Sequence, residues 1–250
     1  MNDRLSLTGH RIIDIAARCF NRNCECSTDF LDLAQQAEFN SIIKELPPVS
    51  YKIMGGYDLS ERKVVVFLPY EDFPLIIPYS IIKIEPANAK FSEELGHRDY
   101  LGSLVGLGVT RDKFGDILID GKNAYVFVMN DMSDYVRDNL NKVRNTIVRT
   151  SYVDAVDFDY QPRFTEITGS VASLRLDAVI ALGFSISRNH VVSYIEDGRV
   201  YVNGRLITTN AYNLKDNDII SVRKLGRIQF MNAISSTRKG RLMVSIRRMI

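Results

Sequence analysis

Apolar residues near the start of the chain recur every three to four positions, the spacing that places them on one face of a helix. The pattern predicts helices over residues 9–20 and 28–46. We expect Thr28 or Asp29 to cap the second helix and Pro47-Pro48 to end it. Both helices carry an apolar stripe that suits packing against a core, so we interpret them as structural.

Shorter apolar runs then alternate with helical patterns as far as residue 156. The expected strands are 63–68, 78–87, 116–119, 123–129 and 150–156, and the expected helices are 99–107 and 133–144. Asp120-Gly121 supplies the turn between the third and fourth strands, and Ser133 is placed to cap the last helix. The alternation predicts a compact α+β sheet domain with its helices on one face.

Residues 158–172 contain few periodic apolar positions, and we interpret them as a linker to a second module. In that module one helix ends at Gly183, and the next begins after the cap Ser187 and ends at Gly198.

The remainder of this module reads as strands. Residues 199–203 alternate, which predicts a strand with Val200 and Val202 inside and Tyr201 outside. Asn203-Gly204 forms a turn, and a further strand covers 219–223.

The composition is that of a folded, soluble protein, with 46% hydrophobic residues among 250. No apolar run approaches the roughly 20 residues of a membrane helix. Charged residues interrupt the apolar part of the N-terminus, which does not fit a secretory signal. We therefore expect a cytoplasmic protein without membrane insertion.

Metal and cofactor chemistry finds little support. The three cysteines all lie within residues 19–26, and the three histidines, His10, His97 and His190, are far apart in the sequence. A structural zinc site needs four ligands, usually as two close pairs. We expect reduced thiols, no metal and no cofactor.

Charge is distributed unevenly along the chain. Residues 1–170 hold 19 basic and 25 acidic side chains, whereas residues 171–250 hold 13 basic and 5 acidic ones. Residues 219–250 contain no acidic residue; their basic residues are Arg223, Lys224, Arg227, Arg238, Lys239, Arg241, Arg247 and Arg248. A basic module on an acidic body is typical of proteins that bind a polyanion, although a solvated surface gives the same pattern.

The helix that begins after Ser187 suits phosphate binding. Its first backbone N–H groups are unpaired and carry partial positive charge, and Arg188 lies in the same turn. Arg175 and the cluster Arg223, Lys224 and Arg227 could converge on the same side. The alternative is that Ser187 is only a cap and Arg188 only a solvated charge.

Several separated motifs then resemble one known module. The order R-L-D, G-F-x-x-S-R, I-x-x-G-x-V-x-V-N-G and L-x-x-x-D-x-I-S-V-R over residues 173–224 is similar to the S4 RNA-binding domain. The resemblance implies two helices and a hairpin that form an RNA surface. It points to Arg175, Ser187, Arg188, Asn203, Gly204 and Arg223 in or beside that surface.

The rest of the chain resembles the YlmH family. The strings that carry the resemblance are MGGYDLSERKVVVFLP, LGHRDYLGSLVGLGVTRDKFGDILI and GRIQFMNAISSTRKGRLMVSIRRMI. It implies an N-terminal helical region (1–60), a central α/β plait similar to an RNA-recognition domain (61–157) and a C-terminal S4-type domain with a basic tail (173–250). It also implies association with large ribosomal subunits that carry stalled peptidyl-tRNA, and a link to cell division.

The central domain is a weaker candidate for RNA binding. Phe67, Tyr125 and Phe127 could stack on bases, as aromatic residues do on RNA-recognition sheets. We favour a core position for them, because such a sheet needs an apolar face under its helices.

The sequence lacks the motifs of the enzyme classes that we considered. Asp177 in RLDAV belongs to a helix rather than to the larger catalytic domain of a pseudouridine synthase. The glycines of residues 101–109 follow no strand, as a methyltransferase turn would require. Adenylate-binding signatures of a tyrosyl-tRNA synthetase are absent, and His97-Arg98-Asp99 lacks the other kinase motifs.

We therefore expect a non-enzymatic protein that binds ribosomal RNA of the large subunit, with tRNA as a possible second RNA. The open alternatives are a factor that docks on a division-machinery protein and an RNA-modifying enzyme.

Overall fold

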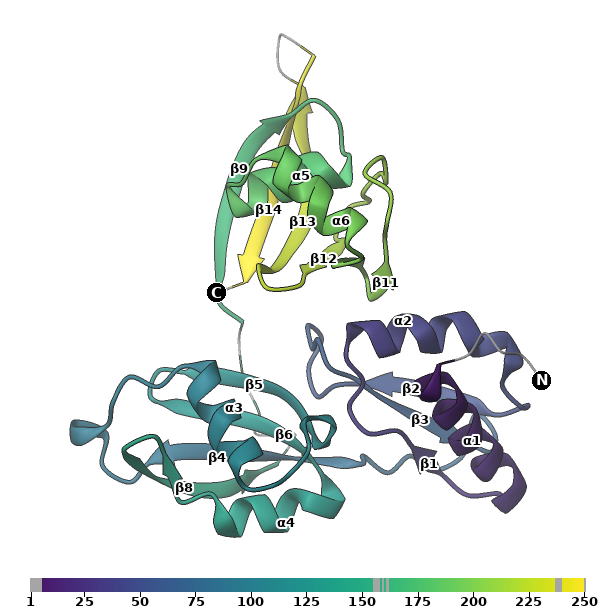
Figure 1. Ribbon diagram of the computed structural model, residues 1–250, viewed down its shortest axis with the longest axis vertical. Helices are drawn as coiled ribbons and strands as arrows, with labels where there is room; N and C mark the ends of the chain where they lie inside the picture. The colour runs from purple at the N-terminus through teal and green to yellow at the C-terminus, as the bar shows by residue number, and fades with distance from the viewer. Residues whose placement is uncertain (1–5, 155–157, 159, 161, 237–239, 250) are drawn as a thin grey trace. The chain divides into compact units, whose positions relative to one another are not determined.

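The computed structural model describes residues 6–154, 158, 160, 162–236 and 240–249. The chain forms two compact units, Met1–Tyr160 and Gln161–Ile250. Helices and strands are mixed in both units, so the structure is of the α+β class (Figure 1).

The N-terminal unit begins with helices packed on a small antiparallel sheet. The helices are α1 (Leu7–Arg22) and α2 (Leu33–Ile42), and a short 3-10 helix, Ile43–Glu45, follows α2. The sheet has the order β1-β3-β2, from β1 (Cys26–Ser27), β2 (Ser50–Met54) and β3 (Val64–Leu68). The expected helical region therefore contains a sheet, and its central strand lies beyond the predicted boundary at residue 60.

Helix α2 begins at Leu33, four residues later than a cap at Thr28 would place its start. Asp32 caps α2 by accepting a hydrogen bond from the Gln35 N–H. Thr28 is buried and accepts from the Val65 N–H at 3.0 Å, and Asp29 pairs with Arg11 at 2.7 Å. The predicted caps are wrong because tertiary contacts occupy both side chains.

A five-stranded antiparallel sheet makes up the rest of this unit. Its elements are β4 (Tyr79–Pro86), α3 (His97–Gly106), β5 (Phe114–Asp120), β6 (Asn123–Met129), α4 (Asn130–Asn139), β7 (Lys142–Val143) and β8 (Thr146–Val153), with short 3-10 helices at Ala89–Phe91 and Arg111–Lys113. The strand order β5-β6-β4-β8-β7, with one helix before β5 and one after β6, is that of an α/β plait. This part of the prediction is confirmed.

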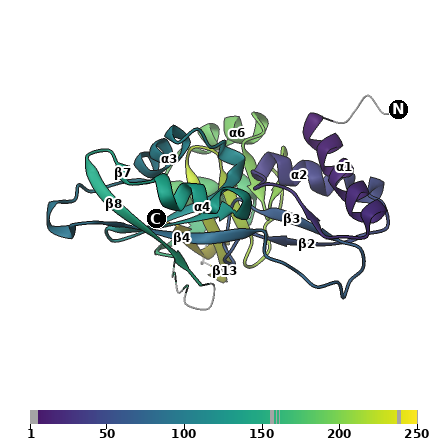
Figure 2. The ribbon, with the colours of Figure 1, turned by 90° about the horizontal axis from the view of Figure 1, so that it is seen from below.

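Helices α3 and α4 cover one face of the plait (Figures 1 and 2). Tyr100 and Leu104 of α3 and Val136 of α4 are buried against the strand residues Val126 and Val128. Ser133 does not cap α4 as predicted, because the helix begins directly after β6 and Ser133 lies buried inside it.

The other face of the plait is closed by aromatic residues and by the N-terminal part of the chain. Phe127 is fully buried there, with the ring of Tyr57 at 6.0 Å and that of Phe158 at 5.4 Å. Tyr125 lies beside Phe158, and Phe67 is buried under α1 and α2. Phe67 and Phe127 are therefore core residues, but Phe127 faces away from the helices rather than under them.

Partly buried polar contacts fix the loop before β3 over this face. Asp116 of β5 accepts hydrogen bonds from the Tyr57 hydroxyl at 2.8 Å and from the Glu61 N–H at 2.7 Å. Arg62 donates to the carbonyl oxygens of Phe114 and Phe30, at 2.9 and 2.6 Å.

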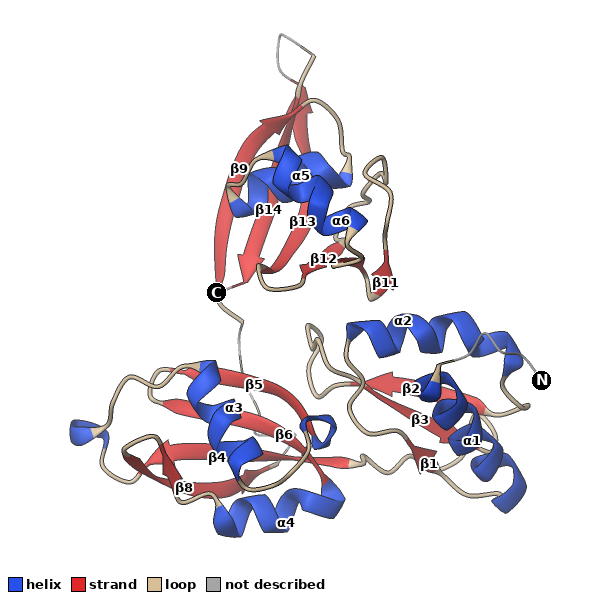
Figure 3. Cartoon of the chain, viewed as in Figure 1, coloured by secondary structure: helices blue, strands red, loops and turns tan. Residues whose placement is uncertain are grey.

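The C-terminal unit is a six-stranded sheet with two helices on one face (Figure 3). Its elements are β9 (Phe164–Val171), α5 (Leu176–Phe184), α6 (Arg188–Glu196), β10 (Val200–Val202), β11 (Arg205–Leu206), β12 (Ile219–Val222), β13 (Gly226–Ser236) and β14 (Leu242–Met249). The strand order is β11-β10-β12-β13-β14-β9. Buried aliphatic residues of α5 and α6 pack against Ile228 and Ile246.

Four expectations for this unit are wrong. The segment interpreted as a linker contains β9, which pairs with β14 along its whole length, and the basic tail is largely the β13–β14 hairpin. Gly183 lies inside α5, and Ser185 takes the left-handed position that ends the helix. Residue 183 is a glycine because Ile228 approaches it too closely for a side chain. Tyr201 is buried, so β10 has apolar contacts on both faces.

Candidate nucleic-acid interface

Two arginines meet at the start of the helices of the C-terminal unit. Arg175 immediately precedes α5, and its backbone position is fixed because the flanking Leu176 N–H donates to the Tyr212 carbonyl oxygen at 2.8 Å. Arg188 is the first residue of α6. Ser187 caps that helix by accepting from the His190 N–H at 3.3 Å, as predicted.

The carboxylate of Asp177, in the first turn of α5, joins these arginines. Arg175 Nε donates to Asp177 Oδ1 at 3.1 Å, and Arg188 Nε donates to Asp177 Oδ2 at 3.2 Å. The Asp177 side chain is 4% exposed, whereas those of Arg175 and Arg188 are 41% and 52% exposed. We call these three residues the Arg-Asp-Arg cluster.

Burial alone would raise the pKa of Asp177. The hydrogen bonds and charges of Arg188 and Arg175 outweigh burial and hold that pKa below its ordinary value. Asp177 is therefore ionised at neutral pH and also offsets the repulsion between Arg188 and the positive end of α6. The cluster keeps one net positive charge and two guanidinium groups that are half exposed, which suits contact with phosphate oxygens.

Two predicted site residues hold the β10–β11 turn. Asn203 and Gly204 both have left-handed backbones, with φ of 50° and 76°. The Asn203 side chain donates to the buried Asp218 at 2.8 Å and accepts from the Ile219 N–H at 2.9 Å. These contacts assign Asn203 a role in holding the turn, and its polar atoms are engaged within the domain.

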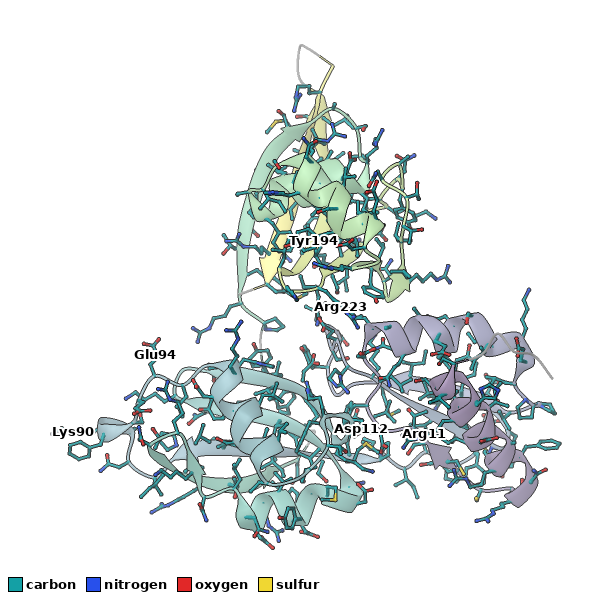
Figure 4. The ribbon with its side chains drawn as sticks, in the orientation of Figure 1. Arg11, Lys90, Glu94, Asp112, Tyr194 and Arg223 are labelled. Atoms are coloured by element: carbon teal, nitrogen blue, oxygen red, sulfur yellow. The ribbon has the colours of Figure 1, made fainter. Side chains whose placement is uncertain are left out.

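A second group of basic residues lies where β12 turns into β13. Arg223 and Lys224 are exposed in this turn, and the Arg223 N–H donates to the Arg199 carbonyl oxygen at 2.9 Å. The Arg199 guanidinium in turn lies 5.7 Å from the ring centre of Tyr194. Tyr194 and Arg223 are labelled in Figure 4.

The predicted residue Arg227 does not share the helix-covered side. Along β13, Ile228 enters the core under α5 and α6, so its neighbour Arg227 lies on the opposite face of the sheet. Arg241 donates to the Ser170 carbonyl oxygen at 2.7 Å, beside β9. The expectation that Arg227 converges with Arg175 is wrong. Arg238 and Lys239 lie outside the described residues.

Sequence reasoning missed Asp177 and the Arg199–Tyr194 pair. The sequence pattern assigns Asp177 only to a helix, although an acid in an apolar helix between two arginine motifs is a signal of a buried, paired carboxylate. Arg199 and Tyr194 come from different elements, and nothing in their spacing marks them as partners.

The thiols form no metal centre in the part of the chain that the structure describes, where no group of three potential ligands could hold an ion. Burial and the neighbouring thiols raise the pKa of Cys19 to about 11. Among the described helices, none is long and apolar enough to span a membrane.

Comparison with family models finds two RNA-binding modules. The model of the proposed RNA-binding domain in YlmH matches residues 71–157, and that of the S4 domain matches residues 174–220.

Two curated proteins are similar to the chain. Identity is 29% over 225 residues with the "Ribosome-associated protein quality control protein P2" of Bacillus subtilis, covering 88% of this chain and 86% of that protein. It is 33% over 75 residues with the "Small ribosomal subunit protein uS4" of Halothermothrix orenii, covering 28% of this chain and 36% of that protein.

Among solved structures, the cell division protein ylmH from Streptococcus pneumoniae aligns with a TM-score of 0.48 at 17% identity. The alignment covers 62% of this chain and 97% of that one.

Proposed function

Because the chain belongs to the YlmH family and carries an S4 domain, we propose that it binds RNA of the large ribosomal subunit during translation quality control or rescue. In this proposal the protein acts by binding, without catalysis, and peptidyl-tRNA on the subunit is a second contact. The observation that carries it is the Arg-Asp-Arg cluster of the S4 domain, which offers two guanidinium groups to phosphate.

Recognition in this proposal depends on shape and phosphate rather than on base edges. Guanidinium groups contact phosphate oxygens in any sequence, and such contacts position a protein on RNA without reading bases. The exposed Arg223 and Lys224 would extend the same contact surface. Arg227 would add contacts from the sheet side, and Arg241 from beside β9. The proposal also includes Arg238 and Lys239, which lie outside the described residues, as phosphate contacts.

The closed face of the plait favours the C-terminal unit as the main RNA contact. RNA-recognition domains stack bases on exposed sheet aromatics. Here Phe127, in the middle of that face, is fully buried beneath Tyr57 and Phe158. Because this face is closed, RNA contacts of the plait would use its edges or loops.

Crosslinking of the protein to RNA in cells, with mapping of the crosslinked sites, tests the proposal. Wild type is compared with Arg188→Glu and with Lys142→Glu, a charge reversal at an exposed residue of the plait. We expect crosslinks on large-subunit ribosomal RNA and tRNA that are lost in Arg188→Glu and kept in Lys142→Glu.

Other crosslinking results would argue against RNA binding through the Arg-Asp-Arg cluster. Diffuse crosslinks, or crosslinks that survive Arg188→Glu, would contradict RNA binding through the cluster. The acidic N-terminal unit would then become the place to look for a protein partner, including one from the division machinery.

A further inference from the structure

Asp177 is the acidic member of a basic surface, and its position beneath the arginines gives it a specific role. Its two carboxylate oxygens accept from Arg175, before α5, and from Arg188, on α6. The carboxylate is almost fully buried, whereas both guanidinium groups remain about half exposed. The acid therefore lies on the protein side of the arginines.

A charge count alone makes this residue unfavourable for RNA binding. An acidic group within hydrogen-bond distance of two phosphate-binding arginines reduces the local positive potential. A buried carboxylate also carries a desolvation cost, which only well-placed partners offset. Neither effect explains an acid at this position in a domain that binds polyanions.

The geometry offers an explanation in the conformational freedom of arginine. A free arginine side chain loses rotamer entropy when it is fixed in one conformation. Asp177 already holds each arginine side chain through both Nε and Nη2. Each guanidinium group keeps Nη1 as a nitrogen that can donate elsewhere. A pre-ordered donor pair binds more tightly than a mobile one, because the ordering cost is met before the ligand arrives.

We propose that Asp177 is a positioning residue for RNA binding, which holds the Arg175 and Arg188 guanidinium groups at a fixed spacing for neighbouring phosphates of an RNA backbone. This inference rests on the proposed function, since it assigns the ligand class of the same site. Arg175 precedes α5 and Arg188 begins α6, so Asp177 also couples phosphate contact to the α5–α6 arrangement.

The variant Asp177→Asn tests the proposal through the sign of its effect. The substitution keeps the shape of the side chain and adds one net positive charge. If potential alone mattered, affinity for RNA would rise. Loss of positioning instead lowers affinity for deproteinised large-subunit ribosomal RNA by about tenfold or more, because both arginine side chains are then ordered only on binding.

A matched control separates charge from position. Glu196→Gln, at the exposed end of α6, makes the same change in net charge on the same unit. We expect this variant to bind the ribosomal RNA as tightly as wild type or more tightly. Asp177→Asn binding at or above the wild-type affinity would overturn the proposal.

The fraction of active molecules distinguishes positioning from a loss of folded protein. Circular dichroism and a stoichiometric titration with ribosomal RNA give this fraction for wild type and for Asp177→Asn. Positioning predicts weaker binding per active molecule in Asp177→Asn, because the two arginines are then ordered only on binding. Wild-type affinity per active molecule would contradict the proposal.

A second variant covers the case in which Asp177→Asn does not fold. Asp177→Glu keeps the charge and both acceptor oxygens but moves them by one methylene. Weaker binding by folded Asp177→Glu supports positioning, and unchanged binding overturns it. Failure of the wild-type protein itself to bind ribosomal RNA would instead refute the proposed function.

Discussion

Gly56 lies directly against the ring of Phe127. The backbone of Gly56 has a φ of 94°, and a Cβ at this position would overlap the Phe127 ring. The loop that closes the sheet face of the plait can approach only because residue 56 has no side chain. Closure of this face therefore depends on one glycine as well as on the aromatic residues around it.

Gly56→Ala is expected to destabilise the N-terminal unit by about 3 kcal/mol. The left-handed backbone costs an alanine roughly 1–2 kcal/mol, and the overlap with Phe127 adds a cost of similar size. Gly121→Ala, at a φ of 60° with open space around it, is the matched control with the backbone cost alone. Urea unfolding followed by circular dichroism, with hydrogen exchange to identify the unit, measures both. Equal losses in the two variants would show that the Phe127 contact is unimportant.

The cysteine region supports a prediction about reactivity. The pKa of Cys19 is raised to about 11 from an ordinary 9.0, so its thiolate fraction near neutral pH falls about a hundredfold. We expect iodoacetamide to label Cys19 at least about a hundredfold more slowly in the native protein than in urea. Peptide mapping by mass spectrometry reads this rate for each cysteine. Labelling of Cys19 at the rate of an unfolded thiol would contradict its buried position.

Regular elements were predictable wherever local pattern and tertiary contact agree. The plait strands are short apolar runs between turn residues, and the caps Ser187 and Gly198 act within their own helix ends. Their local chemistry therefore suffices to locate them. Strand β9 is different, because it is an edge strand in which half of the residues are polar and only Val171 is fully buried.

Contacts between distant residues account for most of what the sequence did not reveal. Gly169 marks close packing against Leu182 rather than a flexible linker. Asp177 and Arg188 are separated by 11 residues and by a helix end, so their hydrogen bond follows from the packing of α5 on α6. The candidate site could thus be located from motifs and charge, but not its buried carboxylate.

The ion pairs of Asp177 predict how stability depends on pH. Its pKa is lowered in the folded protein, so its contribution to stability is complete above the unfolded pKa of about 3.9 and is lost as pH falls through the folded pKa. We expect the wild-type C-terminal unit to lose more stability than Asp177→Asn as pH falls below about 4. Urea unfolding at a series of pH values compares the two. Parallel pH profiles would show that Arg175 and Arg188 do not stabilise the carboxylate.

Salt is expected to weaken RNA binding steeply if the basic residues contact phosphates. With about four phosphates neutralised, affinity should fall roughly a hundredfold between 50 and 200 mM salt. The four contacts would include Arg175 and Arg188, so Arg188→Ala should lower the salt slope by about 0.7–0.9 while weakening binding to all RNA sequences alike. Filter binding with ribosomal RNA and with an unrelated RNA of equal length measures both effects. Phosphate contacts carry no base information, so a loss of affinity in Arg188→Ala that depends on the RNA sequence would indicate that Arg188 reads a base edge. An affinity that does not change with salt would show that phosphate contacts are not the basis of binding.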